Sequence, residues 1–169
     1  LTIAQSPIFA DHIIINEKEY VPVGNLKHGS LSNAKLNNKN FNSADFSQAN
    51  LKNANLSNSS MIGANFEGSN LSRSNLSDSI LDSANLRYCN LSGAHVMSTD
   101  LISADLTGSN LNGANLAGSK LISVSFGSKS SLNRAIFIGT DLTGSTMPES
   151  NLYRSNLRKA NLKGVDLSN

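Results

Sequence analysis

Large apolar residues recur at every fifth position along most of the chain. The series runs without a gap from Leu26 to Phe126, and it resumes at Leu132 and continues to Leu167. Two residues before most of these central positions stands a small residue such as Ala44, and the residue directly before the centre is mostly Asn or Asp. A period of five matches neither the 3.6 of a helix nor the 2.0 of a flat strand. The pattern therefore predicts a chain that turns a corner once per repeat.

Stacked coils bury such a pattern. If each five-residue unit forms one side of a square, four units make a coil, and coils stack through backbone hydrogen bonds about 4.8 Å apart. The central residue and the small residue two positions before it then point inward, where only a small partner fits beside a leucine. We expect an all-β fold, a right-handed quadrilateral parallel β-helix (solenoid) of about seven coils, stabilised by contacts between neighbouring coils. Counting by twenty predicts that Phe46 stacks on Phe66.

The first part of the chain lies outside the repeat. Residues 1–23 carry an apolar run at 13–15 and a second at 20–23, with polar residues between them. This order is typical of two short strands about a turn, and a short helix is the alternative. Because an uncovered coil exposes backbone groups and leucines, we expect this segment to cap the first coil.

The repeat itself occupies 24–169 and has few irregularities. Its register slips by one residue near 127–131, which we interpret as a corner bulge. At the small inward site, Lys39 is the one large polar residue, and Val124 and Val165 are larger than usual. We expect Lys39 to direct its amine toward the cap or solvent.

Several units resemble the A(D/N)LXX repeat of the pentapeptide-repeat family. Residues 43–47 read Ser-Ala-Asp-Phe-Ser, 53–57 read Asn-Ala-Asn-Leu-Ser, and 103–107 read Ser-Ala-Asp-Leu-Thr. The resemblance covers about residues 24–169. It implies a cyanobacterial-type repeat protein, since members of the family are numerous in cyanobacteria. Several of those are exported to the periplasm or thylakoid lumen and have no assigned biochemical role.

Two observations bear on location. The sequence has no apolar run of about 18 residues, so a membrane-spanning helix is not expected. Its opening, Leu-Thr-Ile-Ala-Gln-Ser, is compatible with the remainder of a removed export signal or with a trimmed chain. We predict an exported protein of the periplasm or thylakoid lumen, with a cytoplasmic location as the alternative.

Candidate catalytic groups are sparse. The three histidines, His12, His28 and His95, do not have metal-ligand spacing. The single cysteine, Cys89, occupies a small inward position, where burial is the ordinary role. No hydroxyl has a recognisable base and orienting carboxylate beside it. We therefore predict no catalytic, cofactor or metal site, and no enzymatic activity.

Outward apolar residues form one candidate interaction surface. Counting by twenty places three isoleucines in one column and Met97 and Ile138 on the neighbouring face, with Ile80 near the shared corner; the three are Ile62, Ile102 and Ile122. A contiguous apolar group on a flat wall marks an interface. The alternative is that these are occasional outward apolar residues without consequence.

Basic residues form a second candidate near the C-terminal coils. Arg134 and Arg154 share a column, and three more cations follow beside Tyr153, namely Arg158, Lys159 and Lys163. Such a patch can face an anionic partner. A solvated, solubilising end is the alternative interpretation.

These features favour a non-enzymatic structural or protein-interaction module with an unidentified protein partner. The uncapped C-terminal coil suggests a possible end-to-end homodimer. The alternative is a DNA mimic that modulates DNA gyrase, as the resemblance to fluoroquinolone-resistance members implies. That activity needs a strongly acidic rod, whereas the formal net charge here is +2, which also makes nucleic acid an unlikely partner. Ice binding would need outward threonine columns, which the sequence lacks.

Overall fold

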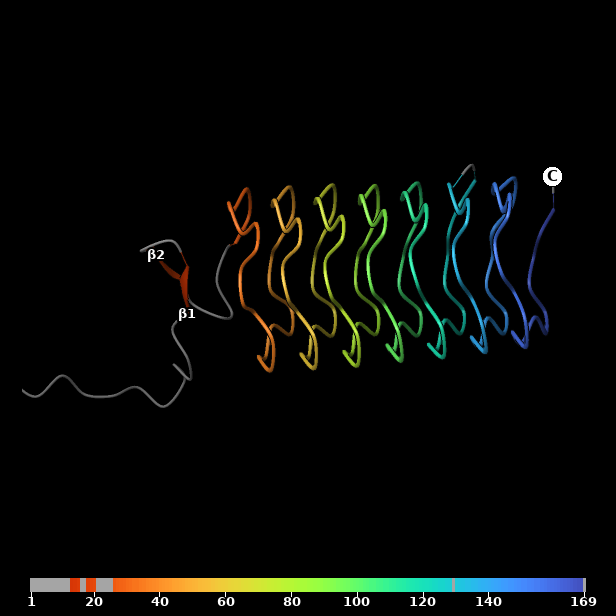
Figure 1. Ribbon diagram of the computed structural model, residues 1–169, viewed down its shortest axis with the longest axis horizontal. Helices are drawn as coiled ribbons and strands as arrows, with labels where there is room; N and C mark the ends of the chain where they lie inside the picture. The colour runs from red at the N-terminus through yellow and green to blue at the C-terminus, as the bar shows by residue number, and fades with distance from the viewer. Residues whose placement is uncertain (1–12, 16–17, 21–25, 129, 169) are drawn as a thin grey trace, which may run out of the picture.

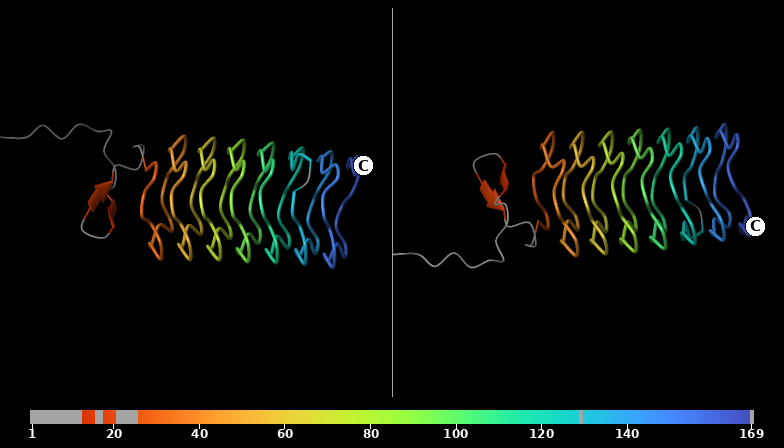
Figure 2. Two further views of the ribbon diagram at one scale, coloured as in Figure 1. Left: turned by 90° about the horizontal axis from the view of Figure 1, so that it is seen from above. Right: turned by 90° about the horizontal axis from the view of Figure 1, so that it is seen from below.

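The repeat forms a solenoid of stacked coils. A computed structural model describes residues 13–15, 18–20, 26–128 and 130–168 of the 169-residue chain. The coils follow one another along the axis of an elongated rod, in the order of the sequence (Figure 1). Two further views show the same single file of coils (Figure 2). Within the described residues the secondary structure consists of turns, isolated bridges and one short hairpin, with no helix.

Backbone bridges fix the length of a coil. Ser30 pairs in parallel with Asn50, and Lys35 pairs with Asn55, so the partner lies twenty residues further on. The bridges recur every five residues and fall in four columns. The Leu26 amide, for example, donates to the Asp45 carbonyl at 2.8 Å. Each coil therefore takes about twenty residues and has four turns, as the five-residue period predicts.

The core is the row of central residues. These side chains are buried from Leu26 through Met147, together with the small residues two positions before them. The rings of Phe46 and Phe66 stack with centroids 4.8 Å apart and planes 2° from parallel, which confirms the predicted stacking of this pair. The ring of Phe41 makes an edge contact with that of Phe46, with centroids 5.1 Å apart, which counting by twenty does not predict. The stacking of the coils therefore limits the size of the inward-pointing side chains, as expected.

Stacking also fixes the turn conformation. The second residue of the turns has a positive φ, and among the described residues eighteen residues other than glycine hold this position beside nine glycines. Arg73, at φ 57°, is one of them. The left-handed region costs most residues about 1 kcal/mol. Coil packing therefore imposes this conformation whether or not glycine is present.

Two interior columns of small residues differ in chemistry. In the alanine column, every amide closes its own turn; the members are Ala44, Ala64, Ala84 and Ala104. In the hydroxyl column, side chains donate to a leucine or valine carbonyl in the preceding coil; the members are Ser59, Ser79, Thr99 and Ser119. The Ser59 hydroxyl, for instance, donates to the Leu36 carbonyl at 3.0 Å and accepts the Lys39 amide at 3.1 Å. The turns that these hydroxyls contact are open, which means that the amide of the turn does not donate to the carbonyl of the same turn. The hydroxyl of the next coil donates to that carbonyl instead.

The register slip appears in the bridges. Asp105 pairs with Ser125 at an offset of twenty, whereas Asn110 pairs with Ser131 at an offset of twenty-one. The offset stays at twenty-one through the Ser125–Thr146 bridge and returns to twenty at the bridge between Ser131 and Asn151. The buried Ser130 hydroxyl donates to the Phe126 carbonyl at this corner. Lys129 lies outside the described residues.

The N-terminal segment contains a hairpin. Strands β1 (Ile13–Ile15) and β2 (Lys18–Tyr20) pair antiparallel, with Ile13 opposite Tyr20. The arrangement is the two-stranded alternative rather than the helix. The second strand starts at Lys18, inside the stretch expected to be the turn, and residues 21–23 lie outside the described residues. The hairpin is drawn beyond the N-terminal end of the rod (Figure 1), and its role as a cap stays a prediction.

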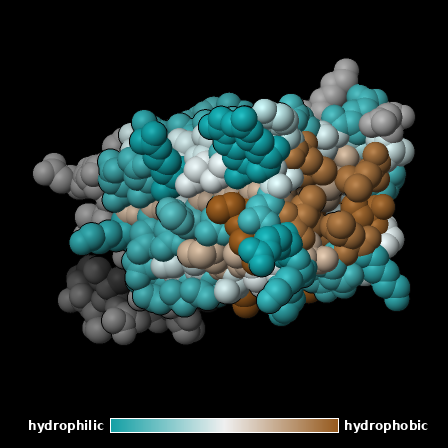
Figure 3. All heavy atoms as spheres, turned by 45° about the vertical axis from the view of Figure 1, so that its right-hand side comes forward, coloured by the Kyte–Doolittle hydropathy of each residue, from teal (hydrophilic) through white to brown (hydrophobic). Residues whose placement is uncertain are grey.

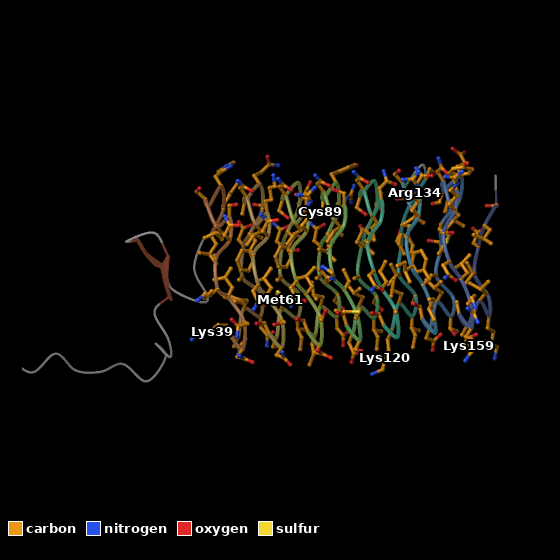
Figure 4. The ribbon with its side chains drawn as sticks, viewed as in Figure 1. Lys39, Met61, Cys89, Lys120, Arg134 and Lys159 are labelled. Atoms are coloured by element: carbon orange, nitrogen blue, oxygen red, sulfur yellow. The ribbon has the colours of Figure 1, made fainter. Side chains whose placement is uncertain are left out.

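Lys39 stands at the N-terminal end of the rod (Figure 4). Its side chain is half-buried, although its neighbours in the hydroxyl column are fully buried. No helix in the described part of the chain is long and apolar enough to span a membrane.

Candidate functional site

Charge is segregated between the sides of the rod. The arginine side comprises the bridges and turns at 30–33, 50–53, 70–73, 90–93, 110–113, 131–134 and 151–154. It carries four cations and none of its described residues is acidic; the cations are Lys52, Arg73, Arg134 and Arg154. The side formed by the Asp45 bridge column holds five carboxylates against two cations, Lys27 and Arg87; the carboxylates are Asp45, Glu67, Asp105, Glu149 and Asp166. A net charge of +2 therefore conceals two sides of opposite sign.

A groove lies on the arginine side. It has a volume of about 570 Å³, and its lining comes from three successive coils: Asn112, Gly113, Asn133, Arg134, Asn151 and Tyr153. Arg134 stands at the upper edge of the rod (Figure 4). Because the lining residues sit on bridged coils, the stacking sets the positions of their backbone atoms.

The groove exists because side chains are missing from one column. The second turn positions on this side run from Asn33 through Arg73 to Arg154, but two consecutive coils have Gly93 and Gly113. A Cβ atom added to Gly113 would meet nothing within 4 Å. A Cβ atom added to Gly93 would lie 3.6 Å from the Arg73 Cγ, so the Arg73 side chain already covers that glycine. Gly113 therefore leaves the open position next to Arg134.

Asparagine side chains give the groove a surplus of hydrogen-bond donors. The Asn112 Oδ1 accepts the Ser131 hydroxyl at 2.8 Å and the Asn133 amide at 3.0 Å. The Asn151 Oδ1 accepts the Tyr153 amide at 3.0 Å. Backbone donors fix which end of each side-chain amide is the oxygen, so the Nδ2 groups of Asn112 and Asn151 remain as donors.

Two arginines stand at the groove with different environments. The Arg154 guanidinium lies 5.1 Å from the ring centroid of Tyr153, in a cation–π contact. The Arg134 side chain is exposed and has no hydrogen bond or ion pair within the part of the chain that the structure describes. Both hold a positive φ, 58° and 57°, although arginine has no local preference for that region.

The basic patch expected from the sequence is divided in the structure. Arg134 and Arg154 lie together on the arginine side, whereas Arg158 and Lys159 occupy the next turn of the coil and Lys163 the one after it. Lys159 appears at the lower edge of the rod, opposite Arg134 (Figure 4). The three asparagines were not anticipated. The sequence feature that could have indicated a groove lined by them is the pair of glycines, Gly93 and Gly113, in a column that otherwise carries large polar side chains.

The outward apolar residues form two strips. Ile62 is 42% exposed and Met97 and Ile138 are exposed, whereas Ile102 and Ile122 are half-buried. The turns place the isoleucine column at one edge of a face and Met97 with Ile138 at the other edge. Exposed Ile80 lies in the bridge column between them, in the middle of this face and not at a corner shared by two neighbouring faces as expected.

Polar groups interrupt this apolar surface. The Lys120 Nζ is 3.1 Å from an Asp100 carboxylate oxygen in the middle of the face. Asp82 lies between two of the isoleucines in their column, and its Oδ1 accepts the Ile102 amide at 3.0 Å. The surface is therefore two apolar edges around a polar centre rather than one continuous wall.

The groups considered for chemistry are placed as follows. Cys89 is 1% exposed, and burial raises the pKa of its thiol to about 11, so it is a neutral thiol at physiological pH. His28 and His95 are exposed, and His12 lies outside the described residues. Across the described ranges, no group of three or more His, Cys, Asp or Glu side chains could hold a metal ion.

Comparison with known families gives a consistent picture. Residues 34–128 match the family model described as "Pentapeptide repeat region", and residues 129–169 match "Pentapeptide repeats (8 copies)". Among curated proteins, none matches the sequence.

Solved structures of repeat proteins also match. A thylakoid-lumen pentapeptide repeat protein of Arabidopsis thaliana is 26% identical, with 69% of this chain and 70% of that chain covered and a TM-score of 0.35. HetL of Nostoc, a pentapeptide repeat protein involved in heterocyst differentiation regulation, is 20% identical over 84% and 88%, with a TM-score of 0.27. QnrB1, a plasmid-mediated fluoroquinolone resistance protein, is 21% identical over 86% and 89%, with a TM-score of 0.38. At these TM-scores the matches imply no shared partner or activity.

Proposed function

Because the chain belongs to the pentapeptide repeat family, we propose that it acts without catalysis, as a rigid rod that presents its outer sides to a protein partner. In this proposal the rod is a right-handed quadrilateral β-helix of about seven coils, since a coil takes about twenty residues. Bridged coils hold outward side chains at fixed spacings, which suits recognition of a partner surface.

The observation that carries the proposal is the face bounded by two apolar edges, one of them at Met97 and Ile138. Ala117 lies between them in the same column, so three successive coils present apolar side chains at one corner. The isoleucine column forms the opposite edge of the same face. The Asp100–Lys120 ion pair between the edges supplies a polar centre, and interfaces combine apolar anchors with polar groups of this kind.

A pull-down from extract of the host cell tests this face. The wild-type chain is compared with a variant carrying Ile62→Lys, Ile102→Lys and Ile122→Lys. The matched control introduces three lysines at exposed turn residues on other sides, through His28→Lys, Asn33→Lys and Asn53→Lys. We expect the isoleucine variant to lose a partner that the control retains. Retention by both variants would remove this face from the proposal.

The C-terminal coil supports a second contact, with another copy of the chain. Leu162 and Leu167 are 42% and 50% exposed, and hydrophobic side chains gather at this end of the rod (Figure 3). Backbone amides of Leu157 and Leu162 also have no partner among the described residues. An end-to-end homodimer would cover both the side chains and the amides. Sedimentation of the wild type and a Leu162→Glu, Leu167→Glu variant tests it, and a wild-type monomer at high concentration would exclude it.

Export to the periplasm or thylakoid lumen completes the proposal. Its support is the family setting, and fractionation of the host cell with an antibody to the rod tests it. The DNA-mimic alternative remains weaker, because one of the five carboxylates on the acidic side, Asp105, lies 3.8 Å from the Arg87 guanidinium. A gyrase supercoiling assay distinguishes the two.

A further inference from the structure

We propose that the groove beside Arg134 binds a ligand that carries a carboxylate or phosphate group. This inference is independent of the proposed protein-binding face, because the groove lies on the arginine side. The first support is charge: four cations and no described acidic residue occupy this side, so the local field favours an anion.

The second support is the balance of donors and acceptors. Hydrogen bonds within the rod occupy the side-chain oxygens of Asn112 and Asn151, which leaves their Nδ2 groups as donors. The Arg134 guanidinium adds a planar set of donors, and no described residue pairs with it. A groove that offers donors and positive charge is complementary to an oxyanion.

The third support is the backbone. Gly113 lacks the side chain that would otherwise fill the column beside Arg134, and a Cβ atom there would meet nothing within 4 Å. Three of the five arginines of the chain hold left-handed turn positions in this one column.

These features define the ligand by its chemistry. Its anionic group is held by the Arg134 guanidinium and the Nδ2 groups of Asn112 and Asn151. The carbon skeleton next to that group contacts the ring of Tyr153, which also lines the groove. A volume of about 570 Å³ accommodates a small acid or a single acidic side chain of a peptide. Both sources present the same chemistry, and the experiment separates them.

Amide chemical-shift titration of the full chain tests the site. The probes are benzoate and phenyl phosphate, with benzamide as the uncharged control of the same shape. We expect saturable shifts at Asn112, Asn133 and Tyr153 with the two anions and none with benzamide. Arg134→Gln should weaken binding about tenfold or more, because hydrogen bonds to a charged group are the strong ones. The matched control, Arg158→Gln, removes an exposed arginine on another side and should leave binding unchanged.

A second pair of variants tests whether the ligand occupies the groove. Gly113→Asn fills the groove, whereas Gly139→Asn adds the same side chain at an equally open turn on another side. Both glycines have a positive φ, 69° and 65°, which asparagine tolerates, so both variants should fold. We expect Gly113→Asn to abolish the saturable shifts and Gly139→Asn to retain them.

A last titration distinguishes the sources of the anion. A blocked tripeptide with a central aspartate is compared with the same peptide carrying asparagine. Binding of the aspartate peptide more tightly than benzoate assigns the groove to an acidic peptide, and the reverse order assigns it to a free small acid. Shifts that do not saturate, or that persist equally in Arg134→Gln and Gly113→Asn, would overturn the proposal.

Discussion

The alanine column and the hydroxyl column occupy equivalent sites in the rod, yet they satisfy the backbone in different ways. In the alanine column each turn closes by itself, as when the Ala104 amide donates to the Leu101 carbonyl at 3.0 Å. In the hydroxyl column the turn at Val96 is open, and the Ser119 hydroxyl of the next coil accepts the Thr99 amide at 3.1 Å and donates to the Val96 carbonyl. One column relies on turn geometry, and the other relies on a side chain from the neighbouring coil.

The difference shows that a small inward residue can couple coils chemically as well as fit between them. Buried backbone groups require partners, and an open turn leaves two of them without one. A hydroxyl supplies both hydrogen bonds because it donates and accepts at once. The hydroxyl column therefore adds side-chain hydrogen bonds between neighbouring coils to the backbone bridges that all four sides have.

The strongest test removes a hydroxyl that serves an open turn. We expect Ser119→Ala to lower the free energy of unfolding by about 4 kcal/mol, because two buried backbone groups lose their partner at about 1–3 kcal/mol each. The matched control is Ser109→Ala, since both serines are 1% exposed and Ser109 donates only to its own turn carbonyl at Leu106. We expect the control to lose about 1 kcal/mol. Urea unfolding followed by circular dichroism measures both, and equal losses would contradict the distinction between the columns.

The same contrast explains what the sequence predicted and what it did not. The five-residue period of large apolar residues predicted the coil of twenty residues, the inward positions and the stacking of Phe46 on Phe66. These features follow from size and spacing, which the sequence displays directly. The open turns were missed because alanine and serine satisfy the same size limit, and only the position of Ser119 relative to the preceding coil reveals its second role.

The candidate groove was predictable only in part. Counting by twenty placed Arg134 and Arg154 in one column, and the structure retains that pair. It was wrong to group Lys159 with them as one patch, because successive turns of a coil face different sides. The donor surplus of Asn112 and Asn151 depends on which side-chain oxygens already accept backbone amides, and composition and spacing contain no such information.

Cys89 sharpens the comparison because its thiol takes the place of a hydroxyl and can ionise. Its Sγ donates to the Phe66 carbonyl at 2.9 Å, as the hydroxyl column donates to carbonyls of the preceding coil. Burial raises the thiol pKa from 9.0 to about 11 in the folded chain. A raised pKa means that the stabilising effect of the neutral thiol is complete below pH 9 and is lost as the pH rises to about 11.

Two pKa units correspond to about 3 kcal/mol, so the unfolding free energy should fall by up to that amount between pH 9 and 11. The comparison is with Cys89→Ser, which keeps a donor at the same site but does not ionise in this range. Lysine and tyrosine titration affects both proteins and cancels in the difference. Denaturant unfolding at half-unit pH steps measures it, and parallel curves for the two proteins would show that the thiol is not desolvated as the structure implies.

The smallest expected effect lies in the alanine column. Ala104→Ser adds a hydroxyl beside a turn that is already closed, so no buried backbone group gains a partner that it lacked. The hydroxyl can donate to the Leu101 carbonyl of its own turn, as Ser109 does to Leu106, and this offsets the cost of burying it. We expect a change in unfolding free energy below about 1 kcal/mol in either direction. A loss as large as that of Ser119→Ala would mean that the alanine column excludes hydroxyls by size, and the two columns would then differ in packing rather than in how their turns are satisfied.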